Sequence, residues 1–366
     1  MPHRMSETPL GVGTLGNLTE QDAQALLREQ PAVVHKDEHV TLWQGSSVEV
    51  LRLLPANSVD SILTTPIRDN RPIQRSAPHP TTNPATTWEV EALRVLKPGG
   101  HLLAFGGTRT WHRLAVTIED AGFDIRDTLA WLHTATGEGV PDGRGAAATI
   151  AAFQPIVMGR KPLSGTVASN VLAHGTGALN IEASRTGLDG GSTIPSGMDR
   201  LNASNAIRGY RPDTYATGTP EIPAKSGRWP TNVLLDQSQA ALLDTQSGQL
   251  TSGNVSAEGF TGPHSAKVYG KFARNELRPD VVYADTGGAS RFFPTFNDHT
   301  NQPDGQPLNL LTWLIRLVTP PGGTNLDPFA TTGATTMAAL NAGFHHIAII
   351  SNPESAPTLI SRLTSA

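Results

Sequence analysis

The feature that most constrains this chain is an alternation of short apolar strands and amphipathic helices in its first and last thirds. In the first third, strands are predicted at 39–43, 59–64, 101–105 and 123–132, with helices at 46–54, 88–96 and 109–121. In the last third, helices at 308–318, 333–341 and 353–363 alternate with strands at 324–326 and 344–350. Strands separated by helices favour an α/β fold with a mostly parallel sheet and helices on both faces.

The middle of the chain breaks this pattern. Residues 134–300 are rich in Gly, Thr, Ser, Asn and Pro, and their apolar runs are short, such as Ile156–Met158 and Val233–Leu235. A long stretch without regular elements inside a compact chain is typical of a functional loop region or of disorder. We interpret it as a loop-rich insertion between two halves of one sheet.

Composition excludes several classes of protein. The formal net charge is −4, which excludes a uniformly basic nucleic-acid coat but leaves room for a local basic groove. The chain has no cysteine, which excludes disulfides, thiolate metal sites and a cysteine nucleophile, and we expect no metal site. No apolar stretch is long enough for a membrane span, and the first residues lack a signal-peptide core, so we expect a cytoplasmic protein without membrane contacts.

Two segments carry a resemblance to a known family. The first is Leu93–Thr110, which contains Lys97-Pro98-Gly99-Gly100 and continues to Phe123, and the second is Leu317–Phe329, which ends in Asp327-Pro328-Phe329. Both resemble the DNA amino-methyltransferases, which transfer a methyl group from S-adenosylmethionine to the exocyclic amine of adenine or cytosine. The resemblance implies a Rossmann-like methyltransferase fold in a permuted order that is typical of phage and bacterial enzymes.

This resemblance also gives the parts of the chain their expected roles. It implies that residues 1–139 form the catalytic half of the sheet, that 140–300 form an insertion similar to a target-recognition region, and that 301–366 form the cofactor-binding half. Weaker likeness runs through Pro155–Asn180 and through Arg228-Trp229-Pro230.

The segment of this chain that matches the family's catalytic loop differs from the family's motif. In the family the loop reads Asp-Pro-Pro-Tyr, where the acid and a backbone carbonyl accept hydrogen bonds from the target amine and the aromatic ring stacks on a flipped base. The matching positions are Thr65, Pro66, Ile67 and Arg68. Thr65 and Pro66 are therefore the candidate catalytic residues, and Arg68 is a candidate for stacking on a base or binding phosphate.

The segment that matches the family's cofactor-binding loop also differs from the family's motif. The family follows Asp-Pro-Phe and one further residue with Gly-x-Gly, which lets the backbone approach the cofactor. Here Asp327, Pro328, Phe329 and Gly333 are kept as candidate cofactor-binding residues, but Thr331 replaces the first glycine. Ile350 stands where the family has an acid that binds both ribose hydroxyls, and an apolar side chain cannot accept those hydrogen bonds.

Three further positions differ in the same way. In the family, the loop before the cofactor half usually reads His-Pro-Thr-x-Lys-Pro, whereas here the matching segment is Gln302–Pro307. The family's usual Gly-Asp after the first strand is Gly45-Ser46 in this chain, and a position that is usually Glu is Gln154.

The candidates for contacts with nucleic acid are the basic residues Arg68, Arg160, Lys161, Arg228 and Lys271.

The segments that build the core match the family, whereas the positions that build the pocket differ together. This pattern predicts a methyltransferase-like protein with impaired or lost catalysis, which binds DNA or pairs with an active methyltransferase subunit or a second copy of itself. One alternative is an active methyltransferase that uses S-adenosylmethionine, with Thr65 and Pro66 holding the amine. The other is a purely structural or interaction protein that needs no cofactor.

Overall fold

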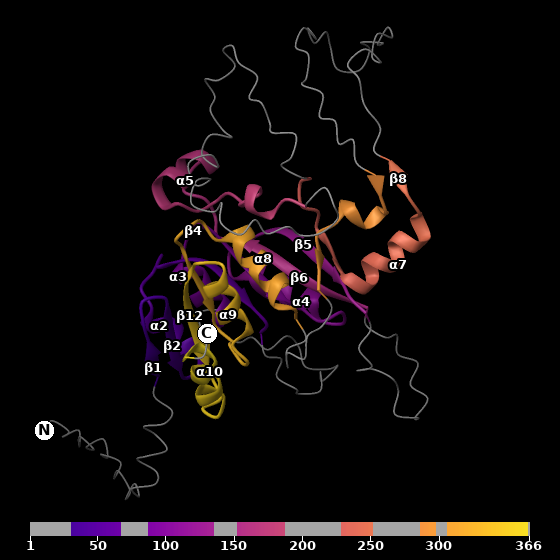
Figure 1. The fold of residues 1–366 in the computed structure, drawn as a ribbon. Coiled ribbons are helices and arrows are strands. Elements are labelled where there is room, and N and C mark those ends of the chain that lie inside the picture. Colours follow the sequence, from indigo (N-terminus) through magenta and orange to yellow (C-terminus); the bar gives the residue numbers. More distant parts are fainter. Residues whose placement is uncertain are drawn as a thin grey trace, which may run out of the picture.

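The computed structural model describes residues 31–66, 87–134, 152–186, 228–251, 286–297 and 306–364. Within them a ten-stranded sheet has the order β1-β2-β12-β11-β3-β4-β6-β5-β7-β10 (Figure 1). Its strands are β1 (Ala32–Lys36), β2 (Val40–Gln44), β3 (Val59–Thr64), β4 (Leu96–Phe105), β5 (Asp124–Leu132), β6 (Phe153–Arg160), β7 (Val233–Asp236), β10 (Thr295–Phe296), β11 (Thr324–Asp327) and β12 (His345–Ile350). A second, two-stranded sheet joins β8 (Leu250–Thr251) and β9 (Thr286–Gly287).

Strand directions confirm the expected mostly parallel α/β sheet. Only β1 and β6 run against the other strands of the ten-stranded sheet, because β1 pairs antiparallel with β2 and β6 pairs antiparallel with both β4 and β5. Residues from three distant parts of the chain meet in its centre, where β11 lies between β12 and β3. The carboxyl ends of β2, β12, β11, β3 and β4 therefore share one edge, where open parallel sheets bind their ligands.

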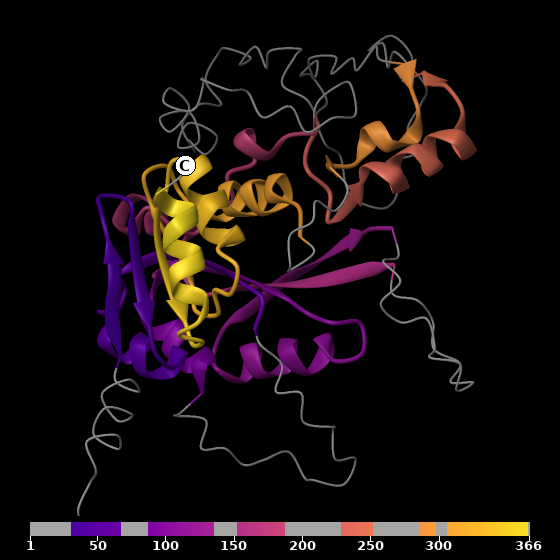
Figure 2. The same ribbon diagram turned by 60° about the horizontal axis from the view of Figure 1, so that its bottom comes forward.

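Helices cover both faces of this sheet (Figure 2). One face packs on α2 (Ser47–Leu53), α3 (Trp88–Val95) and α4 (Trp111–Asp120). The other face packs on α8 (Leu308–Val318), α9 (Ala334–Asn341) and α10 (Ser355–Thr364). The remaining described helices are α5 (Val167–His174), α7 (Gln237–Ser247) and the short η2 (Glu182–Ser184) and η4 (Ala289–Phe292). None of the described helices is long and apolar enough to cross a membrane.

Residues 140–300 contribute to the ten-stranded sheet. Strand β6 lies between β4 and β5, with Phe105 paired to Ile156 and Leu129 paired to the same residue, and β7 and β10 extend the sheet beyond β5. The three-part division at 139 and 300 stays a prediction. Within the described residues, β6, β7 and β10 of the middle segment belong to the same sheet as the flanking halves, whereas β8 and β9 form the separate two-stranded sheet.

Two predicted element boundaries differ from the structure. The helix predicted over 46–54 is α2, Ser47–Leu53, and Ser46 stands at its N-cap without a capping hydrogen bond from its side chain. The strand predicted over 101–105 is longer, because β4 begins at Leu96 and runs through Lys97–Gly100. Gly100 passes so close to the Asp60 carbonyl that a Cβ atom there would lie 2.8 Å from it, so this close pairing needs a glycine.

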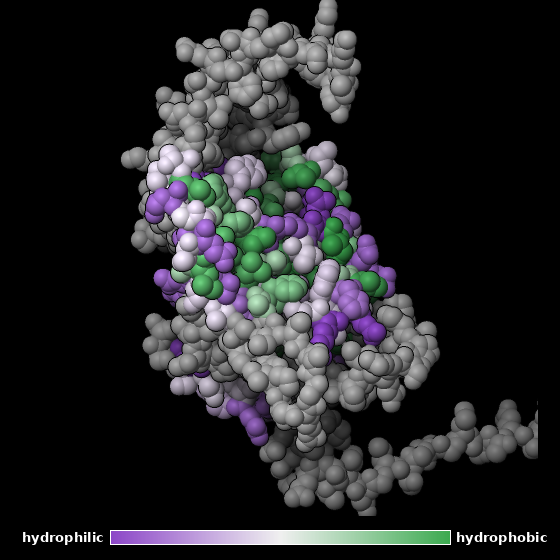
Figure 3. All heavy atoms as spheres, turned by 90° about the vertical axis from the view of Figure 1, so that its right-hand side faces the viewer, coloured by the Kyte–Doolittle hydropathy of each residue, from purple (hydrophilic) through white to green (hydrophobic). Residues whose placement is uncertain are grey.

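The side of the molecule that carries α7 has exposed apolar residues. Leu242, Leu250 and Phe292 come from α7, β8 and η4, and each has more than a third of its surface exposed. Figure 3 shows that hydrophobic and hydrophilic residues are interspersed on this side.

A row of buried polar residues crosses the sheet on the face that α8 covers. In register from β12 to β6 it consists of His346, Asn325, Ser61, His101 and Arg160. Ser61 Oγ lies 2.7 Å from Thr319 Oγ1 and accepts a hydrogen bond from Asn325 Nδ2 at 2.9 Å. Neither ring nitrogen of His346 has a partner among the described residues. Burial therefore lowers the pKa of His346 from 6.5 to about 3.

This buried histidine predicts a loss of stability in acid. Between pH 6.5 and about 3 the unfolded chain binds a proton that the native His346 does not, so the free energy of unfolding falls as the pH falls through that range. We expect His346→Leu to reduce the loss between pH 7 and pH 5 by about 2 kcal/mol, measured by urea denaturation at both pH values. As a control, His112→Gln changes an exposed histidine of α4. Equal pH dependence in His346→Leu and the wild type would contradict the prediction.

Candidate cofactor and catalytic site

The structure brings the candidate catalytic and cofactor-binding residues to one edge of the sheet. Thr65 and Pro66 follow β3, and Asp327–Phe329 covers the end of β11, which pairs with β3 in parallel. The hydroxyl of Thr64 donates a hydrogen bond to Asp327 Oδ1 at 2.7 Å. Residues that the sequence separates by more than 260 positions are thus in contact, as the parallel sheet predicts.

Asp327 is buried and is used within the fold. Its exposed fraction is 3%, and besides the Thr64 hydroxyl its Oδ1 accepts the backbone N–H of Phe329 at 3.0 Å. The next carbonyl, of Pro328, accepts the Ser47 hydroxyl at 2.6 Å. The turn after β11 is therefore tied to β3 and to α2 by side chains of the chain itself.

Phe329 is packed against an aromatic ring. Its ring meets that of Trp88, the first residue of α3, edge to face with the centroids 5.3 Å apart. Aromatic pairs prefer this geometry because the positive edge of one ring faces the negative face of the other. Phe329 therefore contributes to the packing between α3 and the end of β11.

Gly333 is needed for the packing of two helices. It stands at the N-cap of α9 with φ of 81°, in the left-handed region, and a Cβ atom there would lie 2.4 Å from Leu359 Cδ1 in α10. The neighbouring carbonyl, of Thr332, accepts a hydrogen bond from Arg362 Nη1 at 2.6 Å. Helix α10 thus covers the loop that the family uses to approach its cofactor.

Ile350 belongs to the same apolar cluster. It is 1% exposed and packs in a core cluster of β2, β12 and α10 that includes Leu42, Ala348 and Leu359. Its carbonyl accepts the N–H of Gly45 at 3.0 Å, so Ile350 lies next to the Gly45-Ser46 pair, in which Ser46 replaces the family's Asp. An apolar side chain buried in an apolar cluster offers the ribose hydroxyls no acceptor.

Three features of this edge differ from the cofactor-binding pattern of the resembling family. The position of the ribose acid holds a buried isoleucine, Thr331 adds a side chain at the first glycine position, and Leu359 fills the space next to Gly333. The described residues also contain no group of three or more His, Asp or Glu residues that could hold a metal ion.

Two other departures from the family pattern lie side by side. Gln306 stands where the family's loop has lysine and Gln154 where it has glutamate, and Gln306 Nε2 donates to Gln154 Oε1 at 3.4 Å. The family's lysine and glutamate at these two positions, which have opposite charges, are thus both replaced by neutral amides in this chain. Such a pair keeps a hydrogen bond while it removes two charges.

Three of the basic residues proposed for nucleic acid have partners inside the fold. Lys161 Nζ donates to the Leu96 carbonyl at 2.7 Å and to Asn57 Oδ1 at 2.8 Å, so it satisfies a carbonyl at the end of α3. Burial and the charge of Arg94 lower the pKa of Lys161. Arg228 is 8% exposed, and its guanidinium lies 4.7 Å from the centroid of the Phe292 ring.

Arg160 is 9% exposed, and its Nη2 lies 3.4 Å from Asp124 Oδ2. Arg68 and Lys271 lie outside the described residues, as does Ile67. The assignment of these five residues to nucleic acid stays a prediction.

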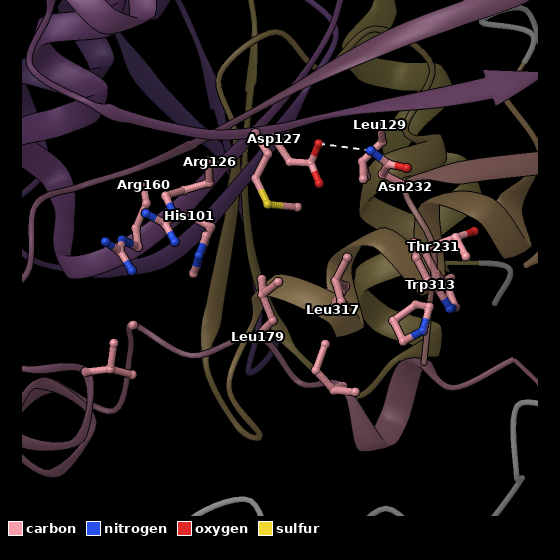
Figure 4. A pocket seen from close by; sticks show the side chains of 15 residues that line it. His101, Arg126, Asp127, Leu129, Arg160, Leu179, Thr231, Asn232, Trp313 and Leu317 are labelled. Atoms are coloured by element: carbon pink, nitrogen blue, oxygen red, sulfur yellow. Dashed lines mark hydrogen bonds between the residues drawn. The ribbon is translucent and has the colours of Figure 1, made fainter. Parts of the chain in front are cut away.

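Sequence reasoning missed a cavity at the opposite edge of the sheet. It has a volume of about 320 Å³, and its lining includes His101, Arg126, Asn232 and Trp313 (Figure 4). His101 sits in an apolar strand and gave no periodic signal of its own. The other lining residues come from distant segments, so only the fold places them together.

The comparisons with known proteins point to one family. The sequence model of a family described as DNA methylase matches residues 76–360, which is most of the chain. A curated relative, the type II methyltransferase M.HindIII of Haemophilus influenzae, is 27% identical over 146 residues. That match covers 34% of this chain and 47% of the relative, so the matched segment spans about half the length of that protein.

Solved structures are similar in overall arrangement. The PvuII DNA methyltransferase, described as cytosine-N4-specific, is 13% identical, with 90% of this chain and 88% of that chain covered and a TM-score of 0.46. TTHA0409 from Thermus thermophilus, complexed with S-adenosyl-L-methionine, is 18% identical, with coverages of 89% and 95% and a TM-score of 0.44.

The packing of Gly333 predicts a specific cost of adding a side chain there. Gly333→Ala introduces left-handed strain and a clash with Leu359, so we expect the free energy of unfolding to fall by about 2–4 kcal/mol. The matched control is Gly343→Ala, at φ of 78° with nothing within 4 Å of the added carbon, which carries the strain alone. Urea denaturation of both variants, with and without Leu359→Ala, separates the two costs. Equal losses in both glycine variants would contradict the assignment.

Proposed function

We propose that this chain, which belongs to the DNA methylase family, does not bind S-adenosylmethionine and transfers no methyl group. It uses the retained scaffold to bind DNA or to pair with an active methyltransferase subunit or with a second copy. One observation carries the proposal: Ile350, at the position of the family's ribose acid, is buried in an apolar cluster, and Leu359 of the same cluster packs against Gly333 of the candidate cofactor loop.

The way in which the differences are grouped supports this reading. The strands and helices that build the sheet follow the family pattern, whereas Thr65, Thr331 and Ile350 depart from it at the edge where chemistry takes place. Gln154 and Gln306 depart together and contact each other. Paired replacement of contacting residues indicates that the edge has adapted as a unit, which suits a scaffold kept for binding.

The second candidate is an active DNA adenine or cytosine amino-methyltransferase. The hydrogen bond between Thr64 and Asp327 favours it, because it keeps Thr65 and Pro66 close to the turn that begins at Asp327. In that reading Thr65 and Pro66 hold the amine, and Asp327, Phe329 and Gly333 hold the cofactor. A third candidate is an interaction protein that reuses the fold and binds neither DNA nor cofactor.

Calorimetric titration separates the first two candidates. We expect S-adenosylmethionine to give no binding to the full chain at concentrations up to about 1 mM, which corresponds to less than about 4 kcal/mol of binding free energy. An active member of the family, titrated in the same buffer, is the positive control. A dissociation constant in the low micromolar range would overturn the proposal.

A series of variants then tests which residues prevent the binding of S-adenosylmethionine. Thr331→Gly with Ile350→Glu supplies the glycine and the acid, and Leu359→Ala adds the room that a carboxylate at position 350 needs. We expect measurable binding to appear in the double variant and to tighten in the triple variant. Thr331→Gly with Leu359→Ala, which lacks the acid, is the matched control, and circular dichroism establishes that each variant is folded.

Binding to duplex DNA tests the scaffold role separately. If basic side chains, Arg68 and Lys271 among them, contact about five phosphates, affinity falls several-hundredfold between 50 and 200 mM salt through counterion release. We expect Arg68→Ala with Lys271→Ala to bind more weakly and with a shallower salt dependence. The measurement is fluorescence anisotropy of a labelled duplex. Undetectable binding at low salt would exclude the DNA role and leave the partner-subunit role, which light scattering and pull-down address.

A further inference from the structure

The cavity of about 320 Å³ lies away from the candidate site. Arg160 closes β6, Arg126 and Asp127 lie near the start of β5, and Asn232 directly precedes β7. Because β6 runs antiparallel to β4 and β5, these positions share the amino-terminal edge of the parallel strands. The candidate cofactor loop lies at the carboxyl edge, so the cavity is a separate site.

One end of the cavity is basic and lacks a full set of partners. Figure 4 shows His101, Arg126 and Arg160 together on one side of it. His101 is 3% exposed, and the buried Nε of Arg160 has no partner among the described residues. The contact between Arg160 Nη2 and Asp124 Oδ2, at 3.4 Å, is long for a charge-assisted hydrogen bond.

Electrostatics at this end favour a bound anion. Burial, followed by the charges of Arg160 and Arg126, lowers the pKa of His101 from 6.5 to about 3, so the ring is neutral at pH 7 and has one N–H to donate. The acidic groups nearby are Asp124, which faces Arg160 and is half exposed, and Asp127. Asp127 Oδ1 accepts hydrogen bonds from the Thr128 N–H at 2.7 Å and from Asn232 Nδ2 at 3.2 Å. This carboxylate oxygen is therefore already hydrogen-bonded to groups on the side of the cavity away from His101.

The rest of the cavity is largely apolar. Its walls include Leu129 and Met158 from the sheet, Leu179 from the segment after α5, and Trp313 and Leu317 from α8. A volume of this size is at the lower end for pockets that take small organic molecules. A basic end and an apolar body together match a ligand that carries one anionic group on an apolar or aromatic frame.

We propose that this cavity binds a small organic anion, a carboxylate or a phosphate monoester, whose anionic group is held by His101, Arg126 and Arg160 and whose apolar part packs on Trp313 and Leu317. The site is independent of the proposed loss of methyl transfer, and neither claim depends on the other.

Calorimetric titration of the full chain with phenyl phosphate, benzoate, inorganic phosphate and phenol tests the proposal. We expect phenyl phosphate or benzoate to bind at least about tenfold more tightly than inorganic phosphate and phenol, because only the first two offer both parts. Whichever of the two binds more tightly identifies the anionic group. Absence of binding by both at millimolar concentration, or no preference over inorganic phosphate and phenol, would overturn the proposal.

Variants place the binding in the cavity. Arg126 is exposed on β5, so Arg126→Ala leaves the core untouched, and we expect it to weaken binding about tenfold or more. Arg113→Ala removes an equal charge from the exposed side of α4, on the other face of the sheet, and we expect no change. Leu179→Trp adds bulk to the apolar wall and should also weaken binding.

The ring of His101 gives a second readout. On ligand binding, nuclear magnetic resonance of the labelled ring, assigned with His101→Gln, should show a shift that inorganic phosphate does not produce at the same concentration. Equal loss of affinity in Arg113→Ala and Arg126→Ala, or an unchanged affinity in Arg126→Ala, would show that binding takes place elsewhere and overturn the proposal.

Discussion

The hydrogen bond from the Thr64 hydroxyl to the buried Asp327 carboxylate joins the two halves of the molecule. A carboxylate with 3% exposure needs hydrogen-bond donors, because an unpaired buried charge would cost several kcal/mol. Thr64 and the Phe329 N–H supply them, and they hold the end of β11 against the end of β3. The edge of the sheet where this family performs chemistry is therefore held in place by contacts that need no ligand.

That internal support changes how retained motif residues are to be interpreted. Asp327 and Phe329 match the family, yet each has a structural role here, Asp327 as an acceptor and Phe329 as a partner of the Trp88 ring. Gly333 also matches, and the packing of Leu359 is enough to require a glycine. A residue needed for packing persists whether or not a cofactor binds. The departures at Thr331 and Ile350 are the more informative positions, because there the residue type itself differs from the family pattern.

Much of the fold could be predicted from the sequence, and the reasons for the gaps are physical. Val59–Thr64 and Leu308–Val318 were predicted with the bounds that the structure shows, because each is a continuous apolar or amphipathic run with clear breakers. The place of β6 between β4 and β5 was not predicted, because pairing register depends on distant strands. The resemblance implied one site for Thr65 and Asp327, and the structure places Thr64, the neighbour of Thr65, in contact with Asp327. The packing of Leu359 against Gly333 was not predicted, since no local pattern links α10 to Gly333.

The two edges of the sheet differ in how fully their polar groups are satisfied. At the carboxyl edge Asp327, Ser47 and Thr64 are paired with one another or with the backbone, and Leu359 and Ile350 fill the apolar space. At the amino edge the Nε of Arg160 is buried without a partner among the described residues, next to the buried ring of His101. Buried polar groups that stay unpaired destabilise a fold unless something binds them. We therefore expect a ligand to gain more from the basic end of the cavity at the amino edge than from the apolar surroundings of Ile350 and Leu359.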